Sequence, residues 1–179
     1  MRPMKPDPGI HVQTVRIPTE NGGVSALLLS PLAAPKNAAG ILWLHGGGYI
    51  AGMKEMVHAS RAVDLAKKFG VAVLSPGYRL ALKAPYPAAI DDCYAALLYL
   101  KAHAAAFGVR SDQLMVGGES AGVPAELDVY HSDMHAFDMM RPDDVLSIQA
   151  AEAFNTRFAD AQARFFAPQH EIQEEHHDS

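Results

Sequence analysis

Short apolar runs, each too short to form a helix, recur along the first two thirds of the chain. They lie at residues 25–29, 41–44, 71–75 and 114–116. Runs of this length, bounded by glycine and proline, are typical of buried strands. Residues 11–17 alternate loosely between apolar and polar, and Asn21-Gly22-Gly23 after them is a hairpin signal. The pattern therefore predicts an N-terminal hairpin followed by separate buried strands.

Helical spacing fills the segments between these strands. Residues 59–69 place small and apolar side chains on one face, and Gly70 is a plausible C-cap. A second helix follows Pro87, with Ile90, Tyr94, Leu97 and Lys101 at helical spacing and Gly108 closing it. A final helix carries an apolar packing stripe of Ile148, Ala151, Phe154, Phe158, Ala161 and Phe165. Strands that alternate with helices predict a mostly parallel sheet covered on both faces.

Glycine-rich motifs follow two of the strands. The strand at 41–44 runs directly into His45 and then Gly46 to Gly48, whose N–H groups no side chain covers. Alone, this stretch fits an ordinary glycine-rich turn equally well. The strand at 114–116 ends in Gly118-Glu-Ser-Ala-Gly122, the G-x-S-x-G elbow that lifts a serine hydroxyl above a strand end. Together, in this order, the two motifs indicate a nucleophilic serine.

Composition narrows the class of protein. The chain has 179 residues, 49% hydrophobic and 20% charged, which suits one soluble domain with a real core. A net charge of −5 argues against nucleic acid and anionic membranes as partners. The single Cys93 excludes an internal disulfide framework and fits a reducing compartment. With no signal peptide and no apolar run of about 20 residues, a cytoplasmic protein is expected.

Four segments resemble a known family. His45-Gly-Gly-Gly48, Tyr78-Arg-Leu80, Pro85–Asp92 and Gly118–Gly122 look like the motifs of the hormone-sensitive-lipase-like esterases of the α/β-hydrolase fold. The resemblance covers residues 12–122. It implies a hydrolase of small carboxylic esters without a metal or organic cofactor. Leu82-Lys83 departs from the family's usual Pro-Glu, at a position we interpret as peripheral.

The resemblance resumes after the elbow, but with residues missing. Val123–Tyr130 and His135–Asp138 are similar to the family's last strand and its catalytic-histidine loop. Only fourteen residues separate Ser120 from His135, and Pro124 discourages a helix after the serine. At least two strand–helix units of roughly 30 residues each are therefore absent. We interpret this as an internal deletion joined at Ala121-Gly122.

The expected fold is thus a single truncated α/β-hydrolase domain over residues 1–168, followed by a disordered tail over 169–179. The sheet should lack two strands between the elbow strand and the last strand. A surviving strand at 125–130 either pairs beside 114–117 or fails to dock. Exposed apolar edges then predict a homo-oligomer or an aggregation-prone protein.

The resemblance assigns the chemistry to five residues. Ser120 is the expected nucleophile and His135 its general base. The N–H groups of Gly47, Gly48 and Ala121 would form the oxyanion hole. Such a site acts on a small-molecule ester through an acyl-enzyme.

The acid of the triad is not identifiable, because only Asp128 and Asp133 lie between serine and histidine. Asp128 alternates with apolar neighbours and should project from a sheet face, whereas Asp133 could reach His135 only in a tight turn. Weak esterase activity is therefore expected. The alternative is a catalytically inactive esterase remnant that serves as a decoy or binding protein.

Other polar residues have a structural and a functional interpretation. His45 fits a structural partner of its own loop better than a catalyst. His131 and His135 could imitate a metal site on a helix, but a helix is not expected there, so no metal is predicted. Asp91-Asp92 begins a helix, where a solvated or structural role fits best. Cys93 fits a core thiol.

Overall fold

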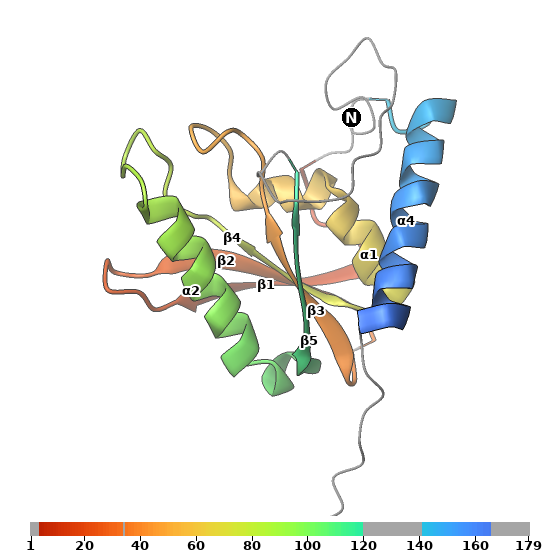
Figure 1. The fold of residues 1–179 in the computed structure, drawn as a ribbon, viewed down its shortest axis with the longest axis horizontal. Coiled ribbons are helices and arrows are strands. Elements are labelled where there is room, and N and C mark those ends of the chain that lie inside the picture. Colours follow the sequence, from red (N-terminus) through yellow and green to blue (C-terminus); the bar gives the residue numbers. More distant parts are fainter. Residues whose placement is uncertain (1–3, 34, 120–140, 166–179) are drawn as a thin grey trace, which may run out of the picture.

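The computed structural model describes residues 4–33, 35–119 and 141–165. The elements follow in the order β1 (Ile10–Ile17), β2 (Val24–Pro31), β3 (Ala38–Leu44), the 3-10 helix η1 (Lys54–Ala59), α1 (Arg61–Phe69), β4 (Ala72–Pro76), α2 (Ala88–Ala102), the 3-10 helix η2 (Ala105–Phe107), β5 (Val109–Gly118) and α4 (Val145–Phe165) (Figure 1). The predicted alternation of strands and helices is confirmed. No helix within the described ranges is long and apolar enough to cross a membrane.

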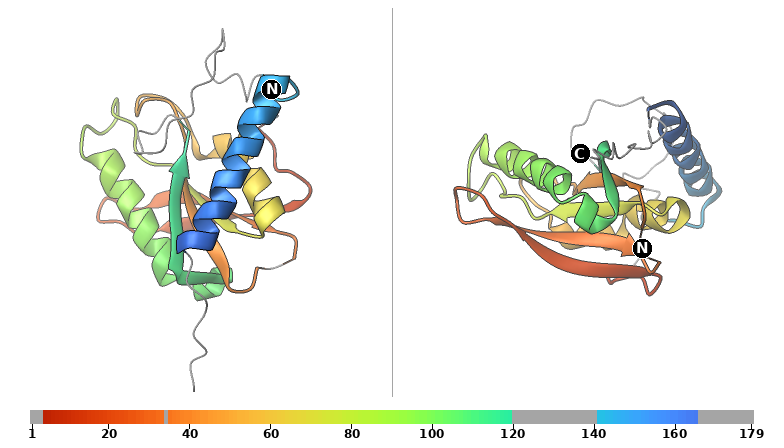
Figure 2. Two further views of the ribbon diagram at one scale, coloured as in Figure 1. Left: turned by 45° about the vertical axis from the view of Figure 1, so that its right-hand side comes forward. Right: turned by 90° about the horizontal axis from the view of Figure 1, so that it is seen from below.

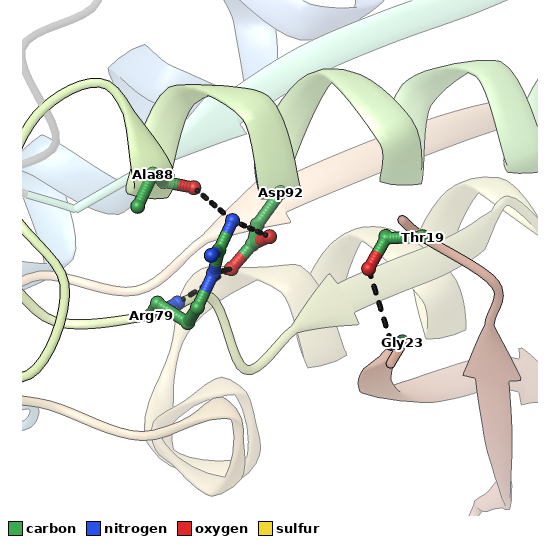
Figure 3. A network of polar contacts seen from close by, with 5 residues as sticks. All are labelled: Thr19, Gly23, Arg79, Ala88 and Asp92. Atoms are coloured by element: carbon green, nitrogen blue, oxygen red, sulfur yellow. Dashed lines mark hydrogen bonds and ion pairs between the residues drawn. The ribbon is translucent and has the colours of Figure 1, made fainter. Parts of the chain in front are cut away.

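The strands form one sheet in the order β1-β2-β4-β3-β5. β2 pairs antiparallel with β1 and β4, whereas β3 pairs parallel with β4 and β5. Only β2 therefore runs against the others, and the prediction of a mostly parallel sheet is confirmed. The predicted hairpin joins β1 to β2, and its turn is closed by the Gly23 N–H, which donates to Thr19 Oγ1 at 3.0 Å (Figure 3). β5 is the last strand on its side of the described sheet.

Helices cover both faces of this sheet, as the sequence predicts (Figure 2). Along β3, Ile41 and Trp43 pack in one core cluster with α1 and Phe158 of α4. Leu42 and Leu44, which point the opposite way, pack in a second cluster with α2. The continuous apolar run at 41–44 thus reflects a strand that is buried on both faces.

The helix predicted from the spacing of Ile90, Tyr94, Leu97 and Lys101 is confirmed as α2, but these residues do not mark its buried face. Ile90 and Tyr94 are 52% and 61% exposed. The stripe that faces the sheet is offset from them and consists of Ala88, Asp92, Ala96 and Leu100. The small side chains of the alanines let the helix approach the strands closely, and Arg79 pairs with the buried carboxylate of Asp92. Neither effect is visible in an apolar pattern.

The helix ends were predicted with mixed success. Gly70 is the C-cap of α1, in the left-handed conformation with φ 70°, as expected. The prediction that Gly108 closes α2 is wrong: α2 ends at Ala102, and Gly108 caps the short η2.

The strand expected at 114–117 extends back to Val109, with an irregular register between Ala38 and Gly40 of β3. The expected strand at 125–130 and the tail at 169–179 lie outside the described residues.

Candidate active site

The two glycine-rich motifs leave the sheet from neighbouring strands. β3 and β5 are parallel, and their register pairs Leu44 with Gly118. The pairing continues one residue further, because the Glu119 N–H donates to the Leu44 carbonyl at 3.2 Å. The carboxyl ends of the two strands therefore lie side by side, at the same edge of the sheet (Figure 1). The glycine loop that starts at His45 thus begins beside the residue that precedes Ser120.

Of the five predicted site residues, the structure describes two. Gly47 and Gly48 lie in the loop after β3. Ser120, Ala121 and His135 lie outside the described residues, as do the candidate acids Asp128 and Asp133.

The glycine loop forms a tight turn around the carbonyl of Gly47. This carbonyl accepts hydrogen bonds from the N–H groups of Ile50, at 3.1 Å, and Ala51, at 3.0 Å. Gly47 has φ 121° and Gly48 has φ 59°. A Cβ on Gly47 would overlap the Ala51 carbonyl, so glycine is required there by both its conformation and the close approach. Among the described residues, the N–H groups of Gly47 and Gly48 have no acceptor, which leaves them available to an anion.

His45 supports this loop, and the expectation of a structural partner is confirmed. Its side chain is only 2% exposed, and Nδ1 lies 2.9 Å from the carbonyl oxygen of Gly46. Burial lowers the pKa of the imidazole, so the ring is neutral at neutral pH. Within the described part of the chain, Nε2 has no hydrogen-bond partner.

Tyr78 packs directly against His45. The two rings are stacked, with centroids 4.0 Å apart and planes at 6°. The Tyr78 hydroxyl donates to the His45 carbonyl at 2.6 Å. Burial raises the pKa of Tyr78 to about 12, so the hydroxyl keeps its proton. Sequence reasoning recognised Tyr78 only as part of a motif, because no local pattern reveals a contact between positions 33 residues apart.

The next residue, Arg79, fixes the segment after β4 to helix α2. Its Nε and backbone N–H both donate to Asp92 Oδ2, at 2.9 and 2.8 Å, and its NH2 group donates to Asp92 Oδ1 at 2.9 Å (Figure 3). The NH2 group also reaches the Ala88 carbonyl at 3.3 Å. Asp92 is 1% exposed, so its predicted structural role is confirmed. This network fixes the residue that follows Tyr78 to helix α2.

The remaining candidate groups for chemistry are metal-ligating clusters and the thiol of Cys93. The described residues contain no group of three or more histidine, cysteine or acidic side chains that could hold a metal. His131 and His135 lie outside the described residues. Cys93 is half-buried, and burial raises the pKa of its thiol to about 12, which leaves it protonated and a poor nucleophile.

Comparison with known proteins places this geometry in a family. Residues 41–129 match a family model described as the alpha/beta hydrolase fold. The chain is 33% identical over 96 residues to hormone-sensitive lipase from Bos taurus, covering 54% of this chain and 13% of that protein. It is also 33% identical over 115 residues to an acetyl esterase from Salmonella paratyphi A, covering 64% of this chain and 35% of the esterase.

Solved structures give the same result. A bacterial heroin esterase is 33% identical, with a TM-score of 0.59 over 64% of this chain and 37% of that one. A thermophilic carboxylesterase cloned from a metagenomic library is 31% identical, with a TM-score of 0.60. The match covers 66% of this chain and 40% of the carboxylesterase. The chain therefore spans well under half the length of these relatives.

The sheet, its two helical layers and the paired motifs define an α/β-hydrolase-fold protein. Within that fold, the matches to hormone-sensitive lipase and to the acetyl esterases support a place in the hormone-sensitive-lipase-like esterase family.

Proposed function

We propose that this protein hydrolyses small carboxylic esters through an acyl-enzyme, with Ser120 as nucleophile and His135 as general base. The observation that carries the proposal is the parallel pairing of β3 with β5, which sets the N–H groups of Gly47 and Gly48 beside the strand that leads into Ser120; neither group has an acceptor among the described residues. The names of the relatives, acetyl esterase and carboxylesterase among them, support this substrate class.

The proposed reaction has two steps. Ser120 Oγ attacks the ester carbonyl carbon as its proton passes to His135, and the carbonyl electron pair moves onto oxygen. The N–H groups of Gly47, Gly48 and Ala121 stabilise that oxyanion. The intermediate collapses, and the alkoxide leaves with the proton from His135. Water then attacks the acyl-enzyme, giving up its proton to His135, and the carboxylic acid is released as Ser120 recovers its proton.

Activity should be weak, because the group that orients His135 is not evident. Asp128 and Asp133 remain the candidate acids. Loss of the correct histidine tautomer costs about four orders of magnitude in turnover in the serine-protease triad. The proposed internal deletion at Ala121-Gly122 would account both for the missing acid and for the coverage of only 35% of the acetyl esterase. An uninterrupted genomic reading frame at this position would contradict the deletion.

The same short coverage supports the alternative, an inactive esterase remnant that acts only as a decoy or binding protein. Intact-mass labelling with a fluorophosphonate probe separates the two functions. In this reaction serine oxygen displaces fluoride, so the probe needs a formed elbow and oxyanion hole.

We expect stoichiometric labelling of the wild type, loss of the label in Ser120→Ala, and full labelling of the control Ser111→Ala, which changes an exposed serine of β5. If folded wild-type protein takes up no label, the hydrolase proposal is wrong and the remnant is favoured.

A further inference from the structure

One peptide unit joins His45 to the proposed oxyanion hole. The carbonyl of Gly46, held by His45 Nδ1, and the N–H of Gly47 belong to the same peptide group. This peptide is trans, since Tyr86-Pro87 is the one cis bond in the described ranges. In a planar trans peptide the C=O and the N–H point in opposite directions. Whatever holds the Gly46 carbonyl therefore also sets the direction of the Gly47 N–H.

We propose that His45 is a positioning residue, whose Nδ1–H holds the Gly46 carbonyl and thereby keeps the Gly47 N–H turned toward the substrate oxyanion. The inference deepens the proposed ester hydrolysis and rests on it. His45 itself does not touch the substrate.

The hydrogen bond determines the tautomer of His45. A carbonyl oxygen only accepts, so the proton must be on Nδ1. Nε2 then carries a bare lone pair, consistent with the absence of any partner for it among the described residues. Burial lowers the pKa of the ring, and this favours the neutral form with its single donor directed at Gly46.

Tyr78 holds the imidazole in the orientation that this requires. Its ring stacks on His45 at 4.0 Å, and its hydroxyl fixes the His45 carbonyl at 2.6 Å. The peptides on both sides of Gly46 are thus anchored, the first by Tyr78 and the second by His45. Gly52 leaves room for this arrangement, because a Cβ there would overlap both Gly46 O and His45 Nδ1.

An anchor is needed because the peptide lies between two glycines. Glycine adopts positive and negative φ with similar ease, so a flip of the Gly46–Gly47 peptide is sterically cheap. A flipped peptide would present a carbonyl oxygen to the substrate oxyanion instead of an N–H. The Gly47–Gly48 peptide is anchored separately, because its carbonyl accepts from Ile50 and Ala51.

Two substitutions separate the hydrogen bond from the packing. His45→Phe keeps a flat ring on Tyr78 but removes the donor, whereas His45→Asn keeps an N–H donor near the Nδ1 position. We expect His45→Phe to lower kcat for p-nitrophenyl acetate and the fluorophosphonate labelling rate by about a hundredfold, with little change in KM, as for the loss of one oxyanion donor. His45→Asn should remain within about tenfold of the wild type.

His103 provides a matched control. Its Nδ1 lies 2.9 Å from the Tyr99 carbonyl, and its ring stacks on Tyr99 at 3.9 Å, but it caps the far end of α2. His103→Phe should keep the wild-type rate. If His45→Phe also keeps the wild-type rate, the positioning role is wrong. It is also wrong if the rates of both His45 variants fall only as far as their lower stability reduces the amount of folded protein.

A second measurement does not depend on activity. Two-bond ¹H–¹⁵N NMR correlations of the imidazole report which ring nitrogen carries the proton. We expect the Nδ1–H tautomer for His45 at pH 7, and a proton on Nε2 would overturn the proposal. If the wild type shows no Ser120-dependent turnover, the proposed function fails, while the NMR result still decides whether His45 holds Gly46.

Discussion

Asp92 is a buried carboxylate that three donors of Arg79 satisfy at once. Its replacement by alanine would leave the Arg79 guanidinium and backbone N–H without their acceptor. Because the Arg79 side chain is 33% exposed, water compensates in part, and we expect a loss of about 3 kcal/mol in the free energy of unfolding, the lower end of the range for such pairs. Urea denaturation of Asp92→Ala measures it.

Asp91 is the control for this prediction, since it lies beside Asp92 but is exposed. Asp91→Ala should cost under about 1 kcal/mol, the typical contribution of a carboxylate near a helix N-terminus. Equal losses in the two variants would contradict the special role of the Asp92 network.

Two buried histidines should make stability depend on pH. Burial lowers the pKa of both His45 and His58 below the ordinary value of 6.5. The unfolded chain then binds more protons than the folded chain as the pH falls below about 6.5, so stability is lost in that direction and is fully present above it. Each histidine contributes a slope of up to about 1.4 kcal/mol per pH unit.

His58→Gln tests this dependence without touching the glycine loop. The free energy of unfolding, measured between pH 5 and 7.5, should fall less steeply on acidification in the variant than in the wild type. Parallel curves would show that His58 is not buried in its neutral form.

At the scale of elements, α4 docks on the sheet through Phe158. This side chain is 6% exposed, and its ring lies 4.9 Å from that of Phe69 at the end of α1. Phe158→Ala should cost about 3–5 kcal/mol by leaving a cavity and should weaken the docking of the whole helix. Urea denaturation and amide hydrogen exchange along α4 measure both effects. Ile148→Ala, at a position that is 46% exposed on the same helix, should have a small effect by comparison.

The sequence predicted the elements of the fold well and their contacts less well. Strand 41–44 and the cap at Gly70 were predictable because local apolar runs and turn chemistry determine them. The buried face of α2 was not predictable, because Asp92 is buried in a pair with Arg79, 13 residues away, while the apolar Tyr94 remains exposed. The stacking of His45 on Tyr78 was likewise invisible. Such contacts depend on how β3 and β4 are paired, not on local patterns.

At the scale of the whole molecule, we expect chains to associate through β5. Among the described residues no strand pairs with its outer edge, and Val116 on it is 43% exposed. Unpaired apolar edges promote association between chains. We expect the wild type to elute above the monomer mass at micromolar concentration, and Val116→Lys to shift the population toward the monomer. Val145→Lys, at an exposed position on α4, is the control. A sharp wild-type monomer peak would contradict the prediction.

The pairing of β3 with β5 also has a consequence for how activity appears during folding. Leu44, which precedes the glycine loop, and Gly118, which precedes Ser120, are more than 70 positions apart in the sequence, and they come together only when this pair of strands closes. Contacts between distant segments form late, because chain entropy opposes them until much of the structure is in place. A chain with β1 to β4 assembled would already hold His45 on Tyr78, yet β5, the strand that leads into Ser120, would not be beside the loop. The proposed esterase activity should therefore be among the last properties to return on refolding, after the hairpin and the first helices are already native.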